Sequence, residues 1–160
     1  MTTEETTAAK VVLTGLLAAG TALWGWFGWL VILWSGSMAL DYLSGSAAAM
    51  KKGEWSSDRA REGLWHKAGT ILAVSVAALA DAAVGLLLRS GFVTLPFRYE
   101  VLLSVIVLAW YTLTELGSIA ENAVQMGARV PGWLRRFLKV SVEAVDEAGK
   151  QITGGGDDGE

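Results

Sequence analysis

The chain alternates between long apolar runs and short stretches that hold its charged residues. The first run, residues 11–40, is thirty residues long and has no charged side chain. A second run covers residues 68–88 and a third covers about 101–120, each with one acidic residue. Since about 20 apolar residues in a helix suffice to cross a bilayer, the pattern predicts an all-α membrane protein with three transmembrane helices.

The first run is longer than one span requires. As a continuous helix it would reach about 45 Å, against a hydrocarbon core of about 30 Å, yet it is too short for two spans and a turn. We therefore expect one tilted helix that continues past a membrane surface. Its second half holds Trp24, Trp26, Trp29 and Trp34, which fit an interfacial aromatic belt. The alternative is a protein–protein face, because the small residues of the run would let another helix approach closely; they are Gly15, Ala19, Ala22, Gly25, Gly28 and Gly36.

The parts outside the spans are polar or amphipathic. Residues 1–10 are predicted to be disordered, and residues 11–126 form the three-span membrane domain. Pro131 opens an amphipathic helix within residues 127–150, which suits the cytoplasmic surface of the membrane or a partner helix. Residues 151–160 form a glycine-rich, acidic tail with nothing to bury, and are predicted to be disordered.

The connection between the first two spans sets the orientation of the chain. It is predicted to break at Gly53 and to restart with Ser56 or Ser57 as the cap of the next helix, with Asp58 in the first turn. Ten of the thirteen basic residues lie in this connection and in the C-terminal segment. Because loops rich in Lys and Arg stay in the cytoplasm, the N-terminus is expected outside and the C-terminus inside.

Composition excludes several classes of function. A net charge of −3 argues against nucleic-acid binding, which needs a basic surface. The absence of cysteine excludes disulfides, iron–sulfur clusters and thiolate zinc sites. His66 is the only histidine, and no nucleophile or base is placed around it. We therefore expect no catalytic site, no cofactor and no bound metal.

Polar and small residues recur at helical spacing in the second and third spans. A small-residue face with one acid carries Gly69, Ala73, Ala77, Asp81 and Gly85. A polar seam in the third span includes Tyr111, Thr112, Glu115, Ser118 and Asn122. Such faces are typical of close helix packing, and we interpret both as a pore or assembly face.

The two intramembrane acids require an explanation, since a carboxylate near the bilayer centre costs about 2.5–3.5 kcal/mol on insertion scales. Asp81 lies in the outer half of its span and Glu115 in the inner half, so they are poor partners for each other. Left unpaired, they indicate a water-accessible surface or a polar assembly interface. The alternative is that both are protonated and hydrogen-bonded inside a helix bundle.

Two further acids lie at the cytoplasmic ends of spans. Asp41 follows the first run and Glu121 follows the third. Lys67 and Arg129 are placed to neutralise them. Anchoring at the membrane surface is the expected role of these end charges.

Three blocks of sequence occur together in a recognisable order. The first is LDYLSG at 40–45, followed by the lysines at 51–52; the second starts at 56–57 and continues through Gly63 and Lys67 to Asp81. The third is TELGSIAEN at 114–122, followed by Met126-Gly127 and Val130-Pro131. In this order and spacing the blocks resemble the holin family of phage-lysis and toxin-secretion proteins.

The resemblance implies a role in lysis. A holin accumulates in the cytoplasmic membrane of the bacterial host and assembles with copies of itself into lesions at a critical level. The lesions release an endolysin or a secreted toxin without direct contact, so the expected partners are lipid and the chain itself. Two alternatives remain: a small ion channel or transporter subunit that uses the intramembrane acids, and a non-conducting membrane scaffold that docks a cytoplasmic partner.

Overall fold

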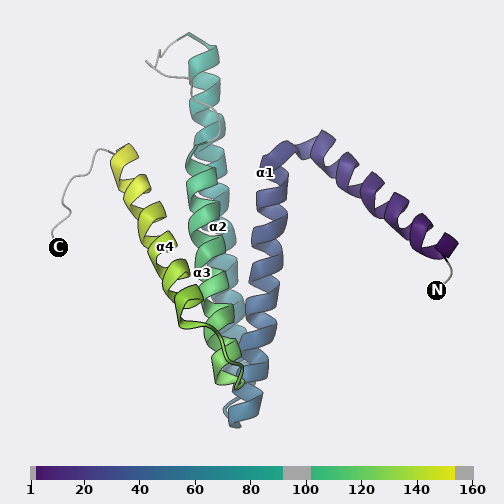
Figure 1. Cartoon of the computed structure of the whole chain (residues 1–160). Coiled ribbons are helices and arrows are strands. Elements are labelled where there is room, and N and C mark those ends of the chain that lie inside the picture. The colour runs from purple at the N-terminus through teal and green to yellow at the C-terminus, as the bar shows by residue number, and fades with distance from the viewer. Residues whose placement is uncertain (1–2, 92–101, 154–160) are drawn as a thin grey trace, which may run out of the picture.

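The computed structural model describes residues 3–91 and 102–153, with side chains in the first helix mainly from residue 25 onward, and these residues form four helices. They are α1 (Thr3–Lys52), α2 (Ser57–Arg89), α3 (Leu103–Gln125) and α4 (Gly132–Thr153) (Figure 1). The expected all-α class is confirmed. Two helices of the described part, α2 and α3, are long and apolar enough to cross a membrane.

Helix α1 is bent at Gly25, where the backbone has φ 59° and ψ −158°. This region of backbone space is open essentially only to glycine, so the bend depends on the missing Cβ. The N-terminal half turns away from the other helices (Figure 1). The sequence predicts one tilted helix over 11–40, whereas the helix is longer and consists of two arms.

The start of α1 corrects the expectation for residues 1–10. The helix begins at Thr3, so most of the segment predicted to be disordered is helical. The segment includes Ala8 and Ala9, and alanine is the strongest helix former.

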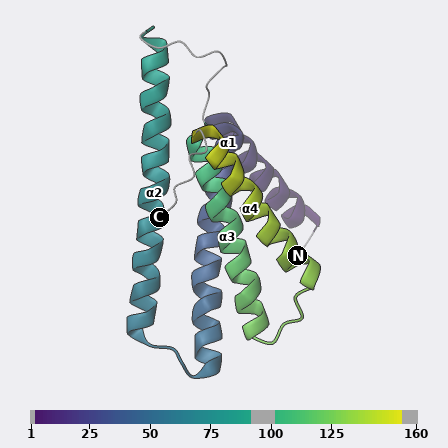
Figure 2. The ribbon, with the colours of Figure 1, turned by 90° about the vertical axis from the view of Figure 1, so that its left-hand side faces the viewer.

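The turn between α1 and α2 has the predicted construction. Gly53 has φ 71° and its backbone N donates to Met50 O at 3.0 Å, which ends α1. Ser56 is the N-cap of α2, and its Oγ accepts a hydrogen bond from Arg59 N at 3.2 Å. Four residues therefore reverse the chain, and α1 and α2 run antiparallel (Figure 2).

Helix α3 is the centre of the bundle. It packs on α1, α2 and α4, whereas α1 and α2 have little direct contact with each other. Its inner face holds the fully buried Leu108 and Ser104 together with Thr112 and Glu115. The position of α3 therefore fixes the positions of the other helices.

Helix α4 folds back along α3. The sequence left two placements open for this helix, the membrane surface or a partner helix, and in the structure it packs on a helix of the same chain. Leu138 is buried, and Val142 and Val145 are half-buried. The helix continues to Thr153, beyond the predicted end at 150. The rest of the predicted tail, residues 154–160, lies outside the described residues.

The tryptophans of α1 do not share one environment. Trp34 is buried, Trp29 is half-buried and Trp26 is 63% exposed. The side chain of Trp24 lies outside the described residues. The tryptophans of this part of α1 therefore do not form a single aromatic face.

We predict that Gly25→Ala straightens α1. Alanine cannot hold the observed φ and ψ without strain of about 1–3 kcal/mol, so the backbone should return to regular helix. Spin labels at Thr14→Cys and Leu43→Cys should then move apart toward about 44 Å, the length of a straight helix of that span. Pulsed dipolar spectroscopy measures this distance, and an unchanged value in the alanine variant would contradict the prediction.

Candidate functional site

A buried ion cluster joins three helices near the α1–α2 turn. Lys67 of α2 lies between two carboxylates: its Nζ is 2.7 Å from Asp41 Oδ2 of α1, and it also bonds to Glu115 of α3. The side chains of Lys67, Asp41 and Glu115 are only 12%, 18% and 7% exposed. Because buried charges must be paired, this cluster holds α1, α2 and α3 in register.

Asn122 completes the coordination of Asp41. Its Nδ2 donates to Asp41 Oδ1 and to Ser44 Oγ, both at 3.1 Å. The two carboxylates thus share one lysine ammonium, and Asp41 alone also accepts from the amide, so the cluster has a formal excess of negative charge. Five polar side chains from three helices are thus joined, and they are Asp41, Ser44, Lys67, Glu115 and Asn122.

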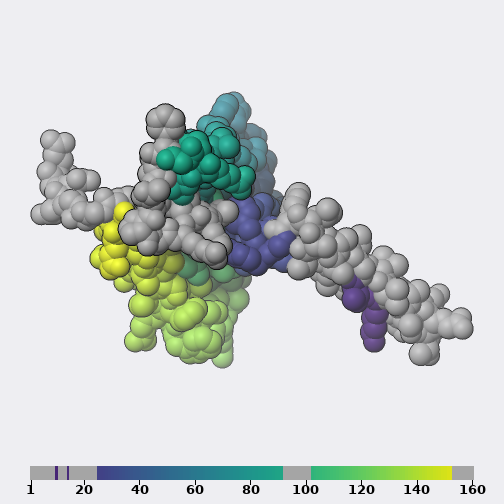
Figure 3. Space-filling model, turned by 90° about the horizontal axis from the view of Figure 1, so that it is seen from above, coloured from purple at the N-terminus to yellow at the C-terminus, as the bar shows by residue number. Residues whose placement is uncertain are grey.

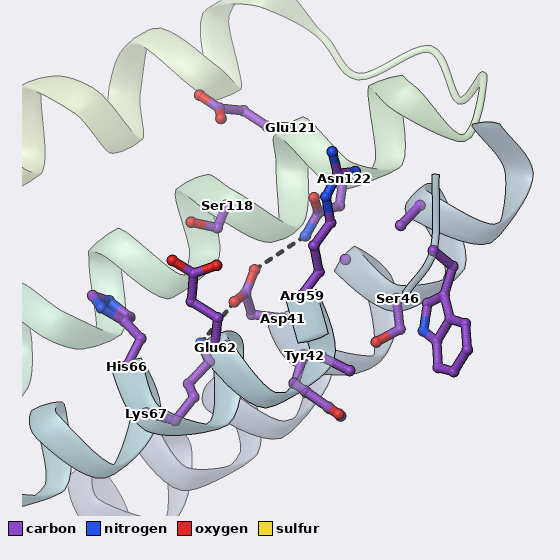
Figure 4. Close-up of a pocket in the computed structure, with 15 residues that line it drawn as sticks. Asp41, Tyr42, Ser46, Arg59, Glu62, His66, Lys67, Ser118, Glu121 and Asn122 are labelled. Atoms are coloured by element: carbon purple, nitrogen blue, oxygen red, sulfur yellow. Dashed lines mark hydrogen bonds and ion pairs between the residues drawn. The ribbon is translucent and has the colours of Figure 1, made fainter. Parts of the chain in front are cut away.

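The cluster borders an open cleft of about 550 Å³ (Figure 4). Ser118 and Glu121 of α3 line one side, and Glu62 and His66 of α2 line another. Glu62, His66 and Glu121 are exposed. Water can therefore approach the cluster from the cleft, whereas its other sides are covered by helices.

The spacing of charges along α2 leaves a long apolar stretch beside the cluster. From Lys67 to Arg89 the helix rises about 33 Å, close to the roughly 30 Å of a hydrocarbon core. Between them the only charged residue is Asp81. The ion cluster therefore lies at the end of this apolar stretch that is nearer the α1–α2 turn.

Asp81 caps the N-terminus of α3 from the neighbouring helix. Its Oδ1 accepts from Leu103 N at 3.0 Å, and its Oδ2 accepts from Ser104 N at 2.8 Å and Ser104 Oγ at 2.6 Å. Leu102, at the N-cap position, provides no side-chain hydrogen bond. The carboxylate thus accepts hydrogen bonds from backbone N–H groups that have no partner within α3. Its negative charge also interacts favourably with the positive end of the helix dipole.

The depth of this contact explains why a carboxylate is needed. Helix α3 begins beside Asp81, about 12 Å along α2 from Arg89, and α2 extends beyond the start of α3 (Figure 2). Unsatisfied backbone N–H groups inside an apolar layer cost several kcal/mol each. The expectation that Asp81 and Glu115 are unpaired is wrong, because Asp81 accepts from the start of α3 and Glu115 pairs with Lys67. As expected, the two acids are not partners of each other.

Two lysines, which the sequence indicated only as part of the family resemblance, hold the other end of α3. Lys51 donates to the carbonyl of Met126, and Lys52 Nζ donates to Gln125 Oε1 at 2.8 Å. Cations are favoured at the C-terminus of a helix. The ends of α3 are thus held by an acid from α2 and by bases from α1.

The structure separates the members of the predicted faces by burial. On α2, Ala77 and Asp81 are buried, Ala73 and Gly85 are half-buried and Gly69 is exposed. On α3, Thr112 and Glu115 are buried, whereas Ser118 and Asn122 are half-buried. The face on α2 is thus buried in its middle and more accessible at both ends. The face on α3 is buried at Thr112 and Glu115 and more accessible toward Asn122.

The end charges behave differently from each other. The pairing of Asp41 with Lys67 is confirmed, at 2.7 Å. Glu121 is exposed, and within residues 102–153 no ion pair joins it to Arg129. The partner that the sequence analysis missed is Glu115, which lies 48 residues after Lys67.

The polar groups of the site join helices to one another. In the part of the chain that the structure describes, no three His, Cys, Asp or Glu side chains are grouped to hold a metal ion. The carboxylates accept hydrogen bonds and ion pairs that join helices. The arrangement pairs polar groups between helices, while large apolar side chains of α2 face outward.

We predict that Lys67→Met destabilises the bundle by about 3–5 kcal/mol, because it leaves two buried carboxylates without their cation. Thermal unfolding of the purified protein in detergent micelles measures the loss. Adding Asp41→Asn and Glu115→Gln to Lys67→Met should restore much of the stability. Lys139→Met, at a lysine whose side chain is 78% exposed, is the matched control, and an equal loss in this control would contradict the prediction.

Comparison with known proteins gives one match. The family model described as the bacteriophage holin family matches residues 18–141. Neither a curated protein nor a solved structure matches the chain. The matched region includes the ion cluster, Asp81 and the first part of α4, and it covers most of the chain, which therefore belongs to the bacteriophage holin family.

Proposed function

We propose that this chain is a holin that oligomerises in the cytoplasmic membrane of a bacterial host and forms timed lesions. The lesions release an endolysin, or a toxin, and so lead to lysis of the host. The observation that carries the proposal is the match to the bacteriophage holin family over residues 18–141. Holins are membrane proteins and not enzymes.

The proposed topology has three spans, with the N-terminus outside and the C-terminus inside. The arm of α1 after Gly25, the part of α2 from Lys67 to Arg89, and α3 are the spans. Support comes from the approximate match between the Lys67–Arg89 rise and the hydrocarbon thickness. The basic residues at the α1–α2 turn and after α3 favour the cytoplasm for that end of the bundle.

The surface of α2 supports contact with lipid and with other copies of the chain. Its outer side carries the exposed Leu72, Val76, Leu79 and Leu86. Gly69 is exposed, and Ala73 and Gly85 are half-buried, beside the buried Ala77 and Asp81; small residues of this kind let neighbouring helices approach closely. We propose that this stripe, with Ser118 and Asn122 on α3, is an assembly face.

The decisive experiment follows release of a large cytosolic reporter enzyme after induced expression in bacteria. We expect abrupt release after a reproducible delay, and faster collapse of the cell wall when a matched endolysin is present. Loss of membrane potential without enzyme release would instead indicate a small ion channel or transporter subunit. Insertion with neither effect would favour a non-conducting scaffold.

We predict that Asp81→Asn delays lysis at equal protein level. The amide cannot provide the two anionic oxygens that hold Leu103 and Ser104, so α2 presents its assembly face less rigidly. The delay is read from the optical density of induced cultures, with immunoblots to match expression. Ser75→Ala, an exposed change on the same helix, should keep the wild-type timing; unchanged timing in Asp81→Asn would exclude a role for this contact.

A further inference from the structure

Helices α3 and α4 form the walls of an open groove of about 600 Å³. Among the described residues, those that line this groove belong to these two helices, so neither α1 nor α2 borders it. Seen from above, α4 (yellow-green) forms one edge of the molecule and α2 (teal) forms another (Figure 3). The groove is therefore accessible from outside the bundle on the side of α4.

The two ends of the groove differ in polarity. The short connection between α3 and α4 makes these helices antiparallel, so the start of α4 lies beside the end of α3. At this end the lining includes Glu121 of α3 with Arg135 and Arg136 of α4. At the other end α3 contributes the apolar Trp110 and Leu113. A ligand that fits the whole groove needs a polar end and an apolar end.

The middle of the groove has room for an apolar chain. A Cβ on Gly117 would have no neighbouring atom within 4 Å. Leu138 and Val142 of α4 line the same stretch. Thr114 donates its hydroxyl to the carbonyl oxygen of Trp110 at 2.9 Å, so its polar group is satisfied within α3. This part of the groove therefore presents an apolar surface with open space beside it.

The charges that line the groove favour an anion. Lys139 Nζ lies 4.0 Å from Glu143 Oε1, so these two charges balance each other. Arg135 and Arg136 are exposed, and neither forms an ion pair with another described residue. Glu121 is the remaining acid of the lining, which leaves an excess of positive charge. Arginine forms bidentate hydrogen bonds with phosphate, so this end of the groove suits a phosphate group.

The groove crosses the level at which the apolar stretch of α2 ends. Glu115, which pairs with Lys67 at that level, lies in α3 between Trp110 and Glu121. From Trp110 to Glu121 the helix rises about 16 Å, which is close to half the thickness of a hydrocarbon core. The groove thus has the length of one acyl chain in one leaflet.

The start of α4 also carries exposed aromatic side chains. Trp133 is 68% exposed and Phe137 is 61% exposed, and both belong to the same two helical turns as the arginines. Tryptophan beside basic residues is typical of the headgroup level of a membrane. The basic end of the groove therefore fits the headgroup level, and its apolar end lies toward the hydrocarbon.

We propose that the α3–α4 groove binds one anionic phospholipid from the leaflet nearer the α1–α2 turn. The phosphate group lies at Arg135 and Arg136, and one acyl chain passes Gly117 toward Trp110. The bound lipid contacts both helices and so stabilises the packing of α4 on α3. This inference rests on the membrane location in the proposed function, but it does not depend on lesion formation.

The probe is dioleoyl phosphatidylglycerol, an anionic lipid, titrated onto the delipidated full-length chain in a neutral detergent. Native mass spectrometry measures the bound lipid, and we expect one molecule per chain. Dioleoyl phosphatidylcholine has the same acyl chains but no net charge, and should bind about tenfold more weakly. Glycerol 1-phosphate, which has the phosphate without the chains, should not compete at the same concentration. Equal binding of the two lipids, or competition by glycerol 1-phosphate, would overturn the inference.

A pair of variants tests the basic end of the groove. Arg135→Gln/Arg136→Gln should weaken phosphatidylglycerol binding by about 30-fold, because two basic residues are lost at the phosphate. Arg59→Gln/Arg61→Gln is the matched control, since it removes the same charge from exposed arginines near the α1–α2 turn. The control should bind as the unmodified chain does. Equal weakening in both variants would show attraction to overall charge and overturn the groove as the site.

Gly117→Leu tests the apolar part of the groove. Leucine is a better helix former than glycine, and the space beside Gly117 is open, so this variant should fold and keep its helix content by circular dichroism. Its side chain should fill the path of the acyl chain and abolish binding of phosphatidylglycerol. Unchanged binding would overturn the inference. Release of the reporter enzyme in bacteria is measured separately, so loss of the lipid site leaves the proposed function standing.

Discussion

The hydrogen bonds from the start of α3 to Asp81 determine how this bundle can exist in a membrane. A helix that begins within an apolar layer exposes backbone N–H groups that lipid cannot satisfy. One carboxylate on α2 accepts from Leu103 and Ser104 and so makes that starting point possible. Because α3 packs on each of the other three helices, the position of its first turn sets the arrangement of the whole molecule.

The ion cluster performs the corresponding role at the other end of the bundle. Lys67 joins Asp41 and Glu115, and Asn122 adds a second donor to Asp41. The two polar contacts lie at different depths, so they fix the tilt of α2 against α3 as well as its position along it. Between them the contact surface is apolar, with Leu108 fully buried. Polar contacts therefore specify the register, and apolar side chains fill the space between.

Sequence reasoning could predict the features that depend on local pattern. The apolar runs gave the helices of the second and third spans, and Gly53 and Ser56 marked the turn between α1 and α2. The pairing of Asp41 with Lys67 followed from their shared place at the ends of spans. Blocks of sequence around these residues also indicated the holin family, to which the chain belongs.

Other features depend on three-dimensional information that no pattern contains. Glu115 and Lys67 are distant in sequence, and their contact follows from the relative level of α2 and α3. The role of Asp81 depends on where α3 begins, and the absence of a capping side chain at Leu102 was the one local signal. Gly25 is one of several small residues in its run, so its bend could not be singled out. The amphipathic pattern of α4 predicted an apolar face but not its partner.

The order of the three charged residues along the chain has a consequence for biosynthesis. Asp41 belongs to α1 and Lys67 to α2, and both precede Glu115 by many residues. When the ribosome has delivered the α1–α2 hairpin, acid and base can already neutralise each other at the turn. The second acid then enters the membrane as part of α3 and meets a cation that is in place. The cation that neutralises Glu115 is thus synthesised before Glu115 itself. Glu115 can therefore pair with Lys67 as soon as α3 inserts.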